Sequence, residues 1–247
     1  MTNSLIMNGK KNLENIKIVI LCGGTGSRLA EETKLIPKPM VKIGRHPIIS
    51  HIIKIYEHYG FNNFLLATGY KNKVLENYFK NKKNVKCVFT GKNTYTGGRL
   101  LRLKKHFKKN ENFMLTYGDG LTNQNLRKLL KFHLKNKKIA TLTAVKPPAR
   151  FGELILKSNK VLKFEEKPQL KDNWINGGYF IFNYEVFNYI SGDTIMLERE
   201  PLTALAKKKQ LLAYKHSGFW QCMDTLRDKR LLEKMIRNQK APWKNLK

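Results

Sequence analysis

IKIVILCGGTGSR, residues 16–28, is the stretch that decides the fold. Its first six residues, 16–21, form an apolar run broken only by Lys17, which is typical of a parallel strand buried on both faces. Three glycines follow at 23–28, and such a loop lets backbone N–H groups approach a phosphate closely. Ligands bind beyond the carboxyl ends of strands in open α/β sheets, so a ligand is expected here. Taken alone, the loop is explained equally well as a plain turn.

Strand-like and helix-like segments alternate through the first 147 residues. Buried-strand patterns occupy 16–21, 64–69, 85–89, 112–117 and 140–145, and helical periodicity occupies 47–59, 71–83, 96–107 and 123–137. After the break at Pro147-Pro148, the spacing predicts a hairpin (153–158 with 160–167), strands at 177–183 and 210–216, and helices at 185–190, 200–209 and 226–238. This order predicts one α/β domain with a modified C-terminal half and no linker.

The net charge is the unusual feature of the composition. Lys and Arg number 48 against 18 Asp and Glu, which gives +30 at pH 7. Such a surplus suggests nucleic acid, an anionic surface or an anionic substrate as partner. The alternative is compositional bias, because Lys runs with Asn and Ile throughout, as in KNKVLENYFKNKKNVK at 71–86. The sequence contains no RNP motif or zinc finger, so no specific nucleic acid is expected.

Cysteine usage and hydropathy bound the compartment. Cys22, Cys87 and Cys222 are odd in number and far apart, so neither a disulfide framework nor structural zinc is expected. No apolar run approaches the ~20 residues of a membrane span, and residues 1–15 lack the apolar core of a signal peptide. We therefore expect a cytoplasmic chain with no membrane partner, a disordered tail at 1–15 and a single domain at 16–247.

Charged side chains stand beside turns in several other motifs. In Pro37-Lys38-Pro39-Met40 the prolines fix the backbone and would aim Lys38 in one direction, the alternative being a solvated side chain. Asp119 lies between glycines after the 112–117 strand, which suits either Mg²⁺ or an Asx turn. Asp224 would be a second carboxylate ligand or a helix N-cap.

Two motifs in the C-terminal half suit a sugar phosphate. Glu165-Glu166-Lys167-Pro168 ends the expected hairpin, and Asn176-Gly177-Gly178 opens the next strand. Carboxylate, amide and glycine backbone suit sugar hydroxyls, and the Lys167 ammonium suits a phosphate. A charged hairpin end is the alternative for the first motif.

Taken together, the motifs resemble those of the sugar-phosphate nucleotidylyltransferases, the closer match being the glucose-1-phosphate cytidylyltransferases. The segments that carry the resemblance stand in family order: GGTGSRLAEET, PKPMVKIG, TGGRL, TYGDG, PPARFGEL, EEKP, INGGYFIFN, GFWQCMDTLRDK and KAPWK. The resemblance implies a Rossmann-like, mostly parallel mixed sheet flanked by helices, of nucleotide-diphospho-sugar transferase type, with a small β extension in the C-terminal half. It also implies that CMP passes from CTP to α-D-glucose 1-phosphate by in-line attack with Mg²⁺, giving CDP-glucose and pyrophosphate.

The resemblance also implies roles for individual residues. Those expected to bind the nucleotide are Gly23, Gly24, Thr25, Gly26, Ser27, Arg28 and Lys38 around the phosphates, and Gly97 and Gly98 near the base or ribose. Lys38 and Arg28 would be the catalytic cations, and Asp119 and Asp224 would ligate Mg²⁺. The residues expected at the sugar phosphate are Gly152, Glu166, Lys167 and Asn176. The partners are thus CTP and a sugar 1-phosphate, in a homo-oligomer.

Two departures from the family pattern keep alternatives open. Ile36 stands where the family has the first Lys of KPKPM, and the segment between Tyr78 and Thr96 is shorter than expected. The short segment leaves open the oligomeric state, the sugar and the base. The alternatives are therefore the same reaction with another sugar 1-phosphate or another nucleotide (UTP or dTTP). The net charge of +30 keeps open a further alternative, a non-specific nucleic-acid-binding basic protein.

Overall fold

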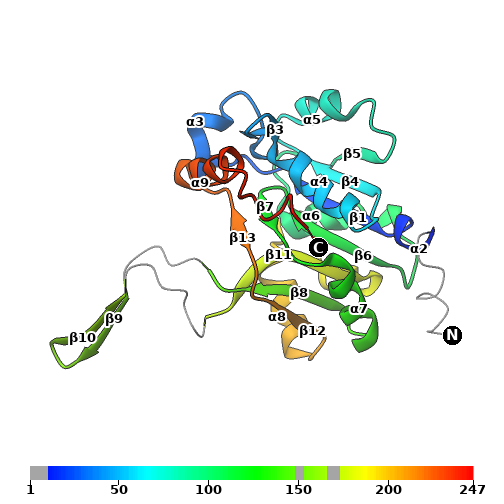
Figure 1. Ribbon diagram of the computed structural model, residues 1–247. Helices are drawn as coiled ribbons and strands as arrows, with labels where there is room; N and C mark the ends of the chain where they lie inside the picture. Colours follow the sequence, from blue (N-terminus) through cyan, green and yellow to red (C-terminus); the bar gives the residue numbers. More distant parts are fainter. Residues whose placement is uncertain (1–10, 148–152, 166–172, 247) are drawn as a thin grey trace.

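A seven-stranded sheet forms the centre of the computed structural model, which describes residues 11–147, 153–165 and 173–246 (Figure 1). Its strands, in spatial order, are β12 (Leu211–His216), β8 (Ala140–Val145), β11 (Ile175–Asn183), β6 (Asn112–Tyr117), β1 (Lys17–Cys22), β4 (Asn63–Thr68) and β5 (Val85–Phe89). All neighbouring pairs run parallel except the two made by β11, which is antiparallel to β6 and β8. The predicted mostly parallel mixed sheet is confirmed.

Helices cover both faces of this sheet because successive side chains of a strand point to opposite faces. In β1, Ile18 and Ile20 face one buried cluster and Val19 and Leu21 face the other. The first cluster is closed by α4 (Ile48–His58), α5 (Asn72–Phe79), α7 (Leu126–Asn136) and α9 (Leu226–Arg237). The second is closed by α6 (Thr96–Arg102), the 3₁₀ helix η4 (Tyr184–Tyr189) and α8 (Glu200–Lys207).

The remaining elements are short. They are α2 (Lys11–Glu14), η1 (Ser27–Leu29), α3 (Ala30–Thr33), η2 (Lys38–Met40), β2 (Lys42–Ile43), β3 (His46–Pro47), η3 (Lys104–His106), β7 (Gly120–Thr122), β9 (Glu153–Lys157), β10 (Lys160–Glu165) and β13 (Trp220–Cys222). Strand β13 pairs antiparallel with β7, so Cys222 lies opposite Gly120. This two-stranded pairing joins segments that are about one hundred residues apart in the chain and has no periodic sequence signal.

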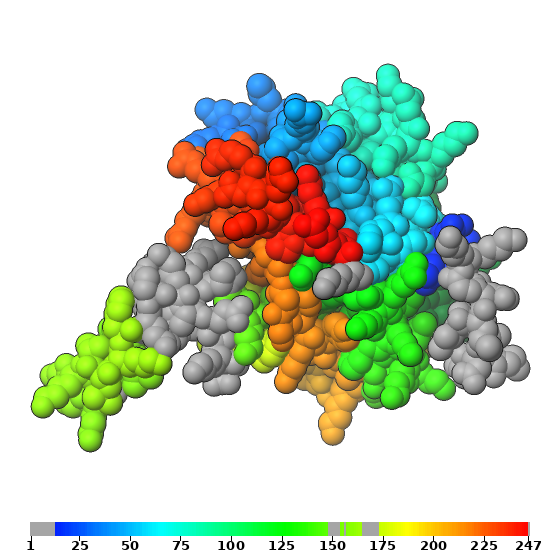
Figure 2. All heavy atoms as spheres, viewed as in Figure 1, coloured from blue at the N-terminus to red at the C-terminus, as the bar shows by residue number. Residues whose placement is uncertain are grey.

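The predicted β extension is the hairpin of β9 and β10, which stands apart from the sheet in Figure 1 and forms an arm in Figure 2. The strands pair antiparallel, with a register shift between Val161 and Lys163. Ser158 takes a positive φ of 51° in the turn. The hairpin exposes Leu154, Ile155, Val161, Leu162 and Phe164, each by more than half of its surface. The described chain therefore does not bury these five apolar side chains.

The structure corrects some expected boundaries. Residues 11–14 were expected in a disordered tail but form α2, because Leu13 packs against the apolar cluster under α4. The helix expected from 123 begins at Leu126, since the Asn125 side chain caps it by accepting from the Lys128 amide. The helix expected over 96–107 ends at Arg102 and resumes as η3. No helix in the described residues is long and apolar enough to cross a membrane.

Candidate active site

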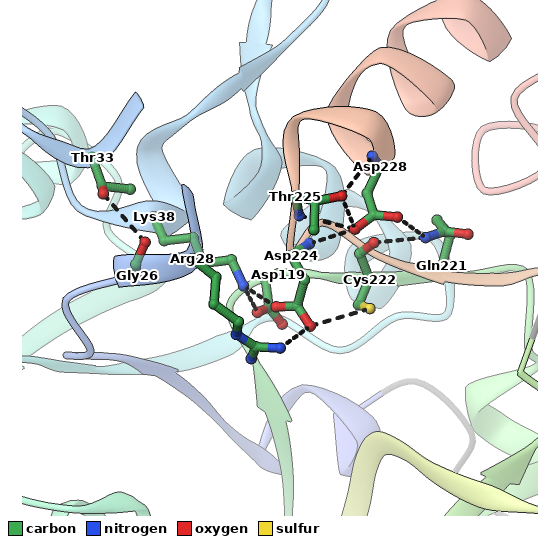
Figure 3. Close-up of polar contacts among 10 residues, drawn as sticks. All are labelled: Gly26, Arg28, Thr33, Lys38, Asp119, Gln221, Cys222, Asp224, Thr225 and Asp228. Atoms are coloured by element: carbon green, nitrogen blue, oxygen red, sulfur yellow. Dashed lines mark hydrogen bonds and ion pairs between the residues drawn. The ribbon is translucent and has the colours of Figure 1, made fainter. Parts of the chain in front are cut away.

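The glycine loop after β1 leads into a tight turn. Gly26 has a φ of +67°, a conformation that favours glycine, and a Cβ there would lie 2.9 Å from the Lys38 Cβ. The Thr33 hydroxyl donates to the Gly26 carbonyl at 3.3 Å and fixes the turn (Figure 3). Gly24, Thr25 and Ser27 are exposed, and a Cβ at Gly24 would meet nothing within 4 Å. The loop thus presents an open stretch of backbone, as a phosphate-binding loop needs.

Lys38 lies between two carboxylates. Its Nζ is 2.5 Å from Asp119 Oδ2 and 2.5 Å from Asp224 Oδ1 (Figure 3). The three side chains are largely buried, with exposed fractions of 12%, 23% and 14%. The structure therefore brings together three residues that the sequence separates by up to 186 positions.

Close backbone packing holds this cluster in place. Gly118 leaves room for Pro39, because a Cβ on Gly118 would lie 2.7 Å from the Pro39 Cγ. The Met223 amide donates to the Asp119 carbonyl at 2.9 Å, which extends the pairing of β7 with β13. The two aspartates are thus set at the ends of paired strands, and Pro39, beside Lys38, packs against the glycine that precedes Asp119.

Asp224 does not cap α9, as the alternative interpretation held. Thr225 is the N-cap and forms a capping box with Asp228, each side chain bonding the other residue's backbone N–H. The Asp228 carboxylate also accepts from the Asp224 amide at 3.1 Å. This arrangement fixes the backbone of Asp224 and leaves its carboxylate for Lys38 and Arg28.

The charges of this cluster reinforce one another. Burial alone would lower the pKa of Lys38, but the adjacent Asp119 and Asp224 carboxylates outweigh it and raise that pKa. Burial would raise the pKa of Asp224, but hydrogen bonding and charge from Lys38, with the charge of Arg28, hold it below its ordinary value. Near neutral pH, both partners therefore keep their charges.

Arg28 and Cys222 stand at the edge of the cluster. Arg28 Nη1 lies 2.9 Å from Asp224 Oδ2, and its side chain is 73% exposed. The Cys222 thiol contacts the same carboxylate oxygen at 3.8 Å (Figure 3). Burial, with the Asp224 charge, raises the pKa of that thiol to about 12. Cys222 therefore stays a neutral thiol. The exposed Arg28 side chain has room to turn toward solvent.

Gly97 and Gly98 pack against the chain around residue 195. Both amides donate to the Ile195 carbonyl, at 3.0 and 3.3 Å, and a Cβ on Gly98 would lie 2.2 Å from the Asp193 carbonyl oxygen. The glycines permit this close approach. Their N–H groups are therefore engaged within the protein, and the role expected for them beside a base or ribose stays a prediction.

Arg99, which the sequence interpretation missed, ties this region to the glycine loop. The side chain is buried, and its Nη2 donates to the Gly23 carbonyl at 2.9 Å. Its Nη1 donates to the Gly91 carbonyl at 2.7 Å and the Thr68 carbonyl at 3.3 Å. Since a Cβ on residue 23 would lie 2.1 Å from Arg99 Nη1, this guanidinium also explains why residue 23 is a glycine. The position of Arg99 in the TGGRL motif is the sequence signal that could have identified it.

The residues expected at the sugar phosphate are only partly described. Asn176 lies on β11, where its Oδ1 accepts from the Gly178 amide at 2.8 Å and its Nδ2 lies 3.5 Å from the Tyr117 hydroxyl. Gly152, Glu166 and Lys167 lie outside the described residues. Tyr117 and its partner Glu198 are polar residues near Asn176 that the sequence interpretation did not select.

The chain is similar in sequence to known proteins. Residues 17–223 match the family model described as "Nucleotidyl transferase". Glucose-1-phosphate cytidylyltransferase of Salmonella typhimurium is 43% identical over 254 residues, covering 93% of this chain and 99% of that protein. D-glycero-alpha-D-manno-heptose 1-phosphate guanylyltransferase of Aneurinibacillus thermoaerophilus is 32% identical and covers 83% of this chain and 89% of its own length.

Solved structures give the same fold. HddC of Yersinia pseudotuberculosis, crystallised with GMP-PN, superposes with a TM-score of 0.71 at 22% identity, covering 90% of this chain and 99% of that one.

The 254-residue match to the Salmonella protein exceeds the 247 residues of this chain, so this chain is shorter within the matched region. By the matches to the family model and to the relatives in sequence, the chain belongs to the nucleotidyl transferase family.

Proposed function

We propose that the chain transfers CMP from CTP to α-D-glucose 1-phosphate, giving CDP-glucose and pyrophosphate. The observation that carries the proposal is the convergence of Lys38, Asp119 and Asp224 beside an open glycine loop. Such a site has cations for phosphates, carboxylates for a metal, and backbone for a triphosphate. The choice of cytosine and glucose rests on the printed function of the relative at 43% identity.

The two carboxylates fit a divalent cation. They already converge on one positive charge, the Lys38 ammonium, with an oxygen from each at 2.5 Å. Mg²⁺ typically takes one or two carboxylates together with substrate phosphates and water. Among the described residues no third His, Cys, Asp or Glu joins a metal-binding group, which fits a site completed by phosphates. Bound there, Mg²⁺ would neutralise charge on the triphosphate.

The reaction is an in-line displacement at the α-phosphorus of CTP. An oxygen of the sugar phosphate forms a bond to that phosphorus, while the bond to the bridging oxygen of the β-phosphate breaks and pyrophosphate leaves. A phosphate monoester is largely dianionic at pH 7, so it attacks without a general base. The work of the protein is positioning and charge neutralisation.

Lys38 and Arg28 neutralise the charge that develops during transfer. The raised pKa of Lys38 keeps its ammonium protonated, so it acts as a fixed charge for the α-phosphate. Arg28 is exposed on the loop and can turn its fork toward the outgoing phosphates. Asp119 and Asp224 hold the Lys38 ammonium, and they are the carboxylates that would bind the proposed cation and so release Lys38 toward the phosphates.

Pyrophosphate release tests the proposal. The protein is incubated with Mg²⁺, glucose 1-phosphate and, in turn, CTP, UTP, ATP, GTP or dTTP, and a Lys38→Ala preparation controls for contaminating enzymes. Release with CTP alone supports the proposal in full. Release with another nucleotide keeps the reaction and replaces the base. No release with any nucleotide overturns glucose 1-phosphate as acceptor, and other sugar 1-phosphates are then tried with CTP.

A further inference from the structure

Lysine runs stand in front of four strands of the central sheet. They are KNKK at 80–83, KKHFKK at 104–109, KNKK at 135–138 and KKK at 207–209, and they precede β5, β6, β8 and β12 in that order. These strands all run in one direction, because β6 and β8 are both antiparallel to β11 and every other pairing in the sheet is parallel. The topology therefore gathers the four runs at one end of the sheet, on the side of α2 and the end of α7 in Figure 1. We call these four runs the lysine edge.

Compositional bias alone does not explain where these runs lie. Every Lys-Lys pair of the sequence falls in one of the four runs, apart from the pair at 10–11, which also precedes a parallel strand, β1. No Lys-Lys pair stands directly after the carboxyl end of a parallel strand. A bias toward lysine would act on both ends of the strands alike.

Helix ends explain part of the pattern but not its extent. The helices α5, α6, α7 and α8 all end at this edge, and a cation in the last turn of a helix balances the helix dipole. That effect falls off within the last turn. Lys83 and Lys109 lie well beyond the helix ends at Phe79 and Arg102, so the runs continue where the dipole no longer favours them.

The charges of the lysine edge are exposed and largely unpaired. Most of its lysines are exposed, and the rest are half-buried. Among the ion pairs of the described residues, only Lys82 of these runs takes part, at 3.2 Å from Glu57. Glu111, at the same end of the sheet, is already paired with Lys17 at 2.5 Å. The edge therefore carries a surplus of positive charge that the carboxylates of the described chain do not neutralise.

This surplus covers an area and not a line. The outermost strands of the seven-stranded sheet are β12 and β5, so at about 4.8 Å per strand the runs before them lie about 29 Å apart. Runs 80–83 and 135–138 stand at the ends of α5 and α7, which cover one face of the sheet. Runs 104–109 and 207–209 stand at the ends of α6 and α8, which cover the other face. The charge thus extends across both helix layers as well as along the sheet.

Charge and shape together favour the anionic surface of a lipid membrane. A polybasic patch binds a negatively charged leaflet through summed charge and needs no pocket for a headgroup. The runs contain no arginine, the residue that makes bidentate contacts to nucleic-acid phosphates. A nucleic-acid strand follows a groove with aromatic platforms, whereas this patch spans the whole end of the domain. The expectation of no membrane partner rests on the lack of a membrane span, which contact by charge does not need.

Such a contact would leave the proposed active site open. The glycine loop and Asp119 follow β1 and β6, at the opposite ends of the strands from the lysine edge. A six-residue strand such as β6 spans about 20 Å, which is about two Debye lengths at physiological salt. Substrates would therefore enter from the side that faces away from the membrane, and changes at the edge should leave the site electrostatically undisturbed.

We propose that the lysine edge binds reversibly to the anionic surface of a lipid membrane, with the carboxyl ends of the strands turned away from the bilayer. The proposal goes beyond the proposed function and does not depend on it, because membrane binding is measured without any substrate. Since the contact is electrostatic, it depends on lipid charge and weakens as salt is added.

Sedimentation with lipid vesicles tests the proposal. The full-length protein is mixed with vesicles of phosphatidylglycerol and phosphatidylcholine and, in parallel, with vesicles of phosphatidylcholine alone, at about 0.1 M salt. We expect binding to the anionic vesicles only, and loss of that binding by about 0.5 M salt. Equal binding to both kinds of vesicle, or binding to neither, overturns the proposal.

Two triple variants and a matched control separate the lysine edge from net charge. A lysine at an anionic membrane strengthens binding about fivefold, so replacing three should weaken binding by up to about a hundredfold. One edge variant carries Lys135→Gln, Lys137→Gln and Lys138→Gln, and the other carries Lys207→Gln, Lys208→Gln and Lys209→Gln. The control carries Lys34→Gln, Lys42→Gln and Lys73→Gln, which remove the same charge from exposed lysines outside the edge. A control that weakens binding as much as the edge variants overturns the proposal, because net charge alone then suffices.

Competition and folding controls complete the test. Duplex DNA or RNA of random sequence, added at an equal concentration of phosphate, should leave the protein on the anionic vesicles. Displacement from the vesicles would assign the edge to nucleic acid and overturn the proposal. The edge variants should keep the unfolding temperature and the pyrophosphate release of the wild type, and because they alter different helix ends, loss of folding in one leaves the other to decide. Absence of pyrophosphate release in the wild type would overturn the proposed function and leave the vesicle result standing.

Discussion

The cluster of Lys38, Asp119 and Asp224 and the loop of Gly23–Arg28 serve the same proposed substrate, but they are built in opposite ways. The cluster is buried and assembled from three distant segments by ion pairs, with Lys38 only 12% exposed. The loop is one contiguous stretch of backbone, and its only cation, Arg28, is 73% exposed. The protein thus prepares the charged centre in advance and leaves the loop to be completed by its ligand.

Replacing Lys38 in the buried cluster should have the largest effect on activity. Lys38→Ala takes away a preorganised charge and leaves two buried carboxylates facing one another, so we expect kcat to fall on the order of 10² or more. Pyrophosphate release at saturating substrates measures the loss. Lys42→Ala, an exposed lysine on β2, is the matched control and should retain activity. A kcat for Lys38→Ala within a few-fold of wild type would remove Lys38 from the proposed mechanism.

Neutralising a carboxylate should show whether it binds the proposed metal in addition to Lys38. Asp119→Asn keeps the shape but lowers the negative charge, so we expect the Mg²⁺ concentration for half-maximal activity to rise by at least about tenfold. Titration of Mg²⁺ at fixed CTP measures this shift. Glu185→Gln, an exposed carboxylate on η4, is the control. An unchanged Mg²⁺ requirement would mean that Asp119 only anchors Lys38.

The loop should be more tolerant than the cluster. Arg28→Ala removes an exposed ion pair, which typically contributes less than about 1 kcal/mol to folding. We expect the unfolding temperature to stay unchanged and the KM for CTP to rise several-fold, because the lost fork contacts phosphate only when ligand is present. Thermal denaturation beside steady-state kinetics checks both parts. A large loss of stability would show that the loop, like the cluster, is prepared in advance.

The smallest expected effect is on the pH dependence of the free energy of unfolding, to which the cluster contributes. The folded-state pKa of Asp224 is depressed, so its contribution is present above the unfolded pKa and is lost as pH falls through the folded value. The contribution of Lys38 has the opposite sign, since its pKa is raised and its share is lost only in strong alkali. The free energies of unfolding of the wild type and Asp224→Asn, measured in urea, should therefore converge as the pH falls below about 4. A constant difference between the two free energies down to acid pH would contradict this.

The sequence predicted the elements with strong periodicity and missed the short ones. Long apolar runs such as 112–117 and amphipathic stretches such as 47–59 gave the sheet and its helices, because burial of one face leaves a repeat. Strands β7 and β13 have three residues each and no such repeat. Their pairing, which brings the segments of Asp119 and Asp224 side by side, is a tertiary contact that only the fold reveals.

The sequence selected the side chains of the charged cluster but not the contacts that connect them. The motifs selected Arg28, Lys38, Asp119 and Asp224, and the structure brings these four together. Arg99 stood in a quoted motif, but its five hydrogen bonds link segments that lie apart in the sequence.

The ion pairs around Asp224 also bear on how ligands would enter. Lys38 and Arg28 together balance the charges of Asp119 and Asp224, so this small group of side chains is electrically neutral. If a divalent cation bound to the two carboxylates, both basic side chains would lose these partners and become available to phosphate. Binding of the metal and of the nucleotide would then be thermodynamically coupled, and each would tighten the binding of the other by the same factor. The neutral group of side chains would thereby favour binding of the two as one complex.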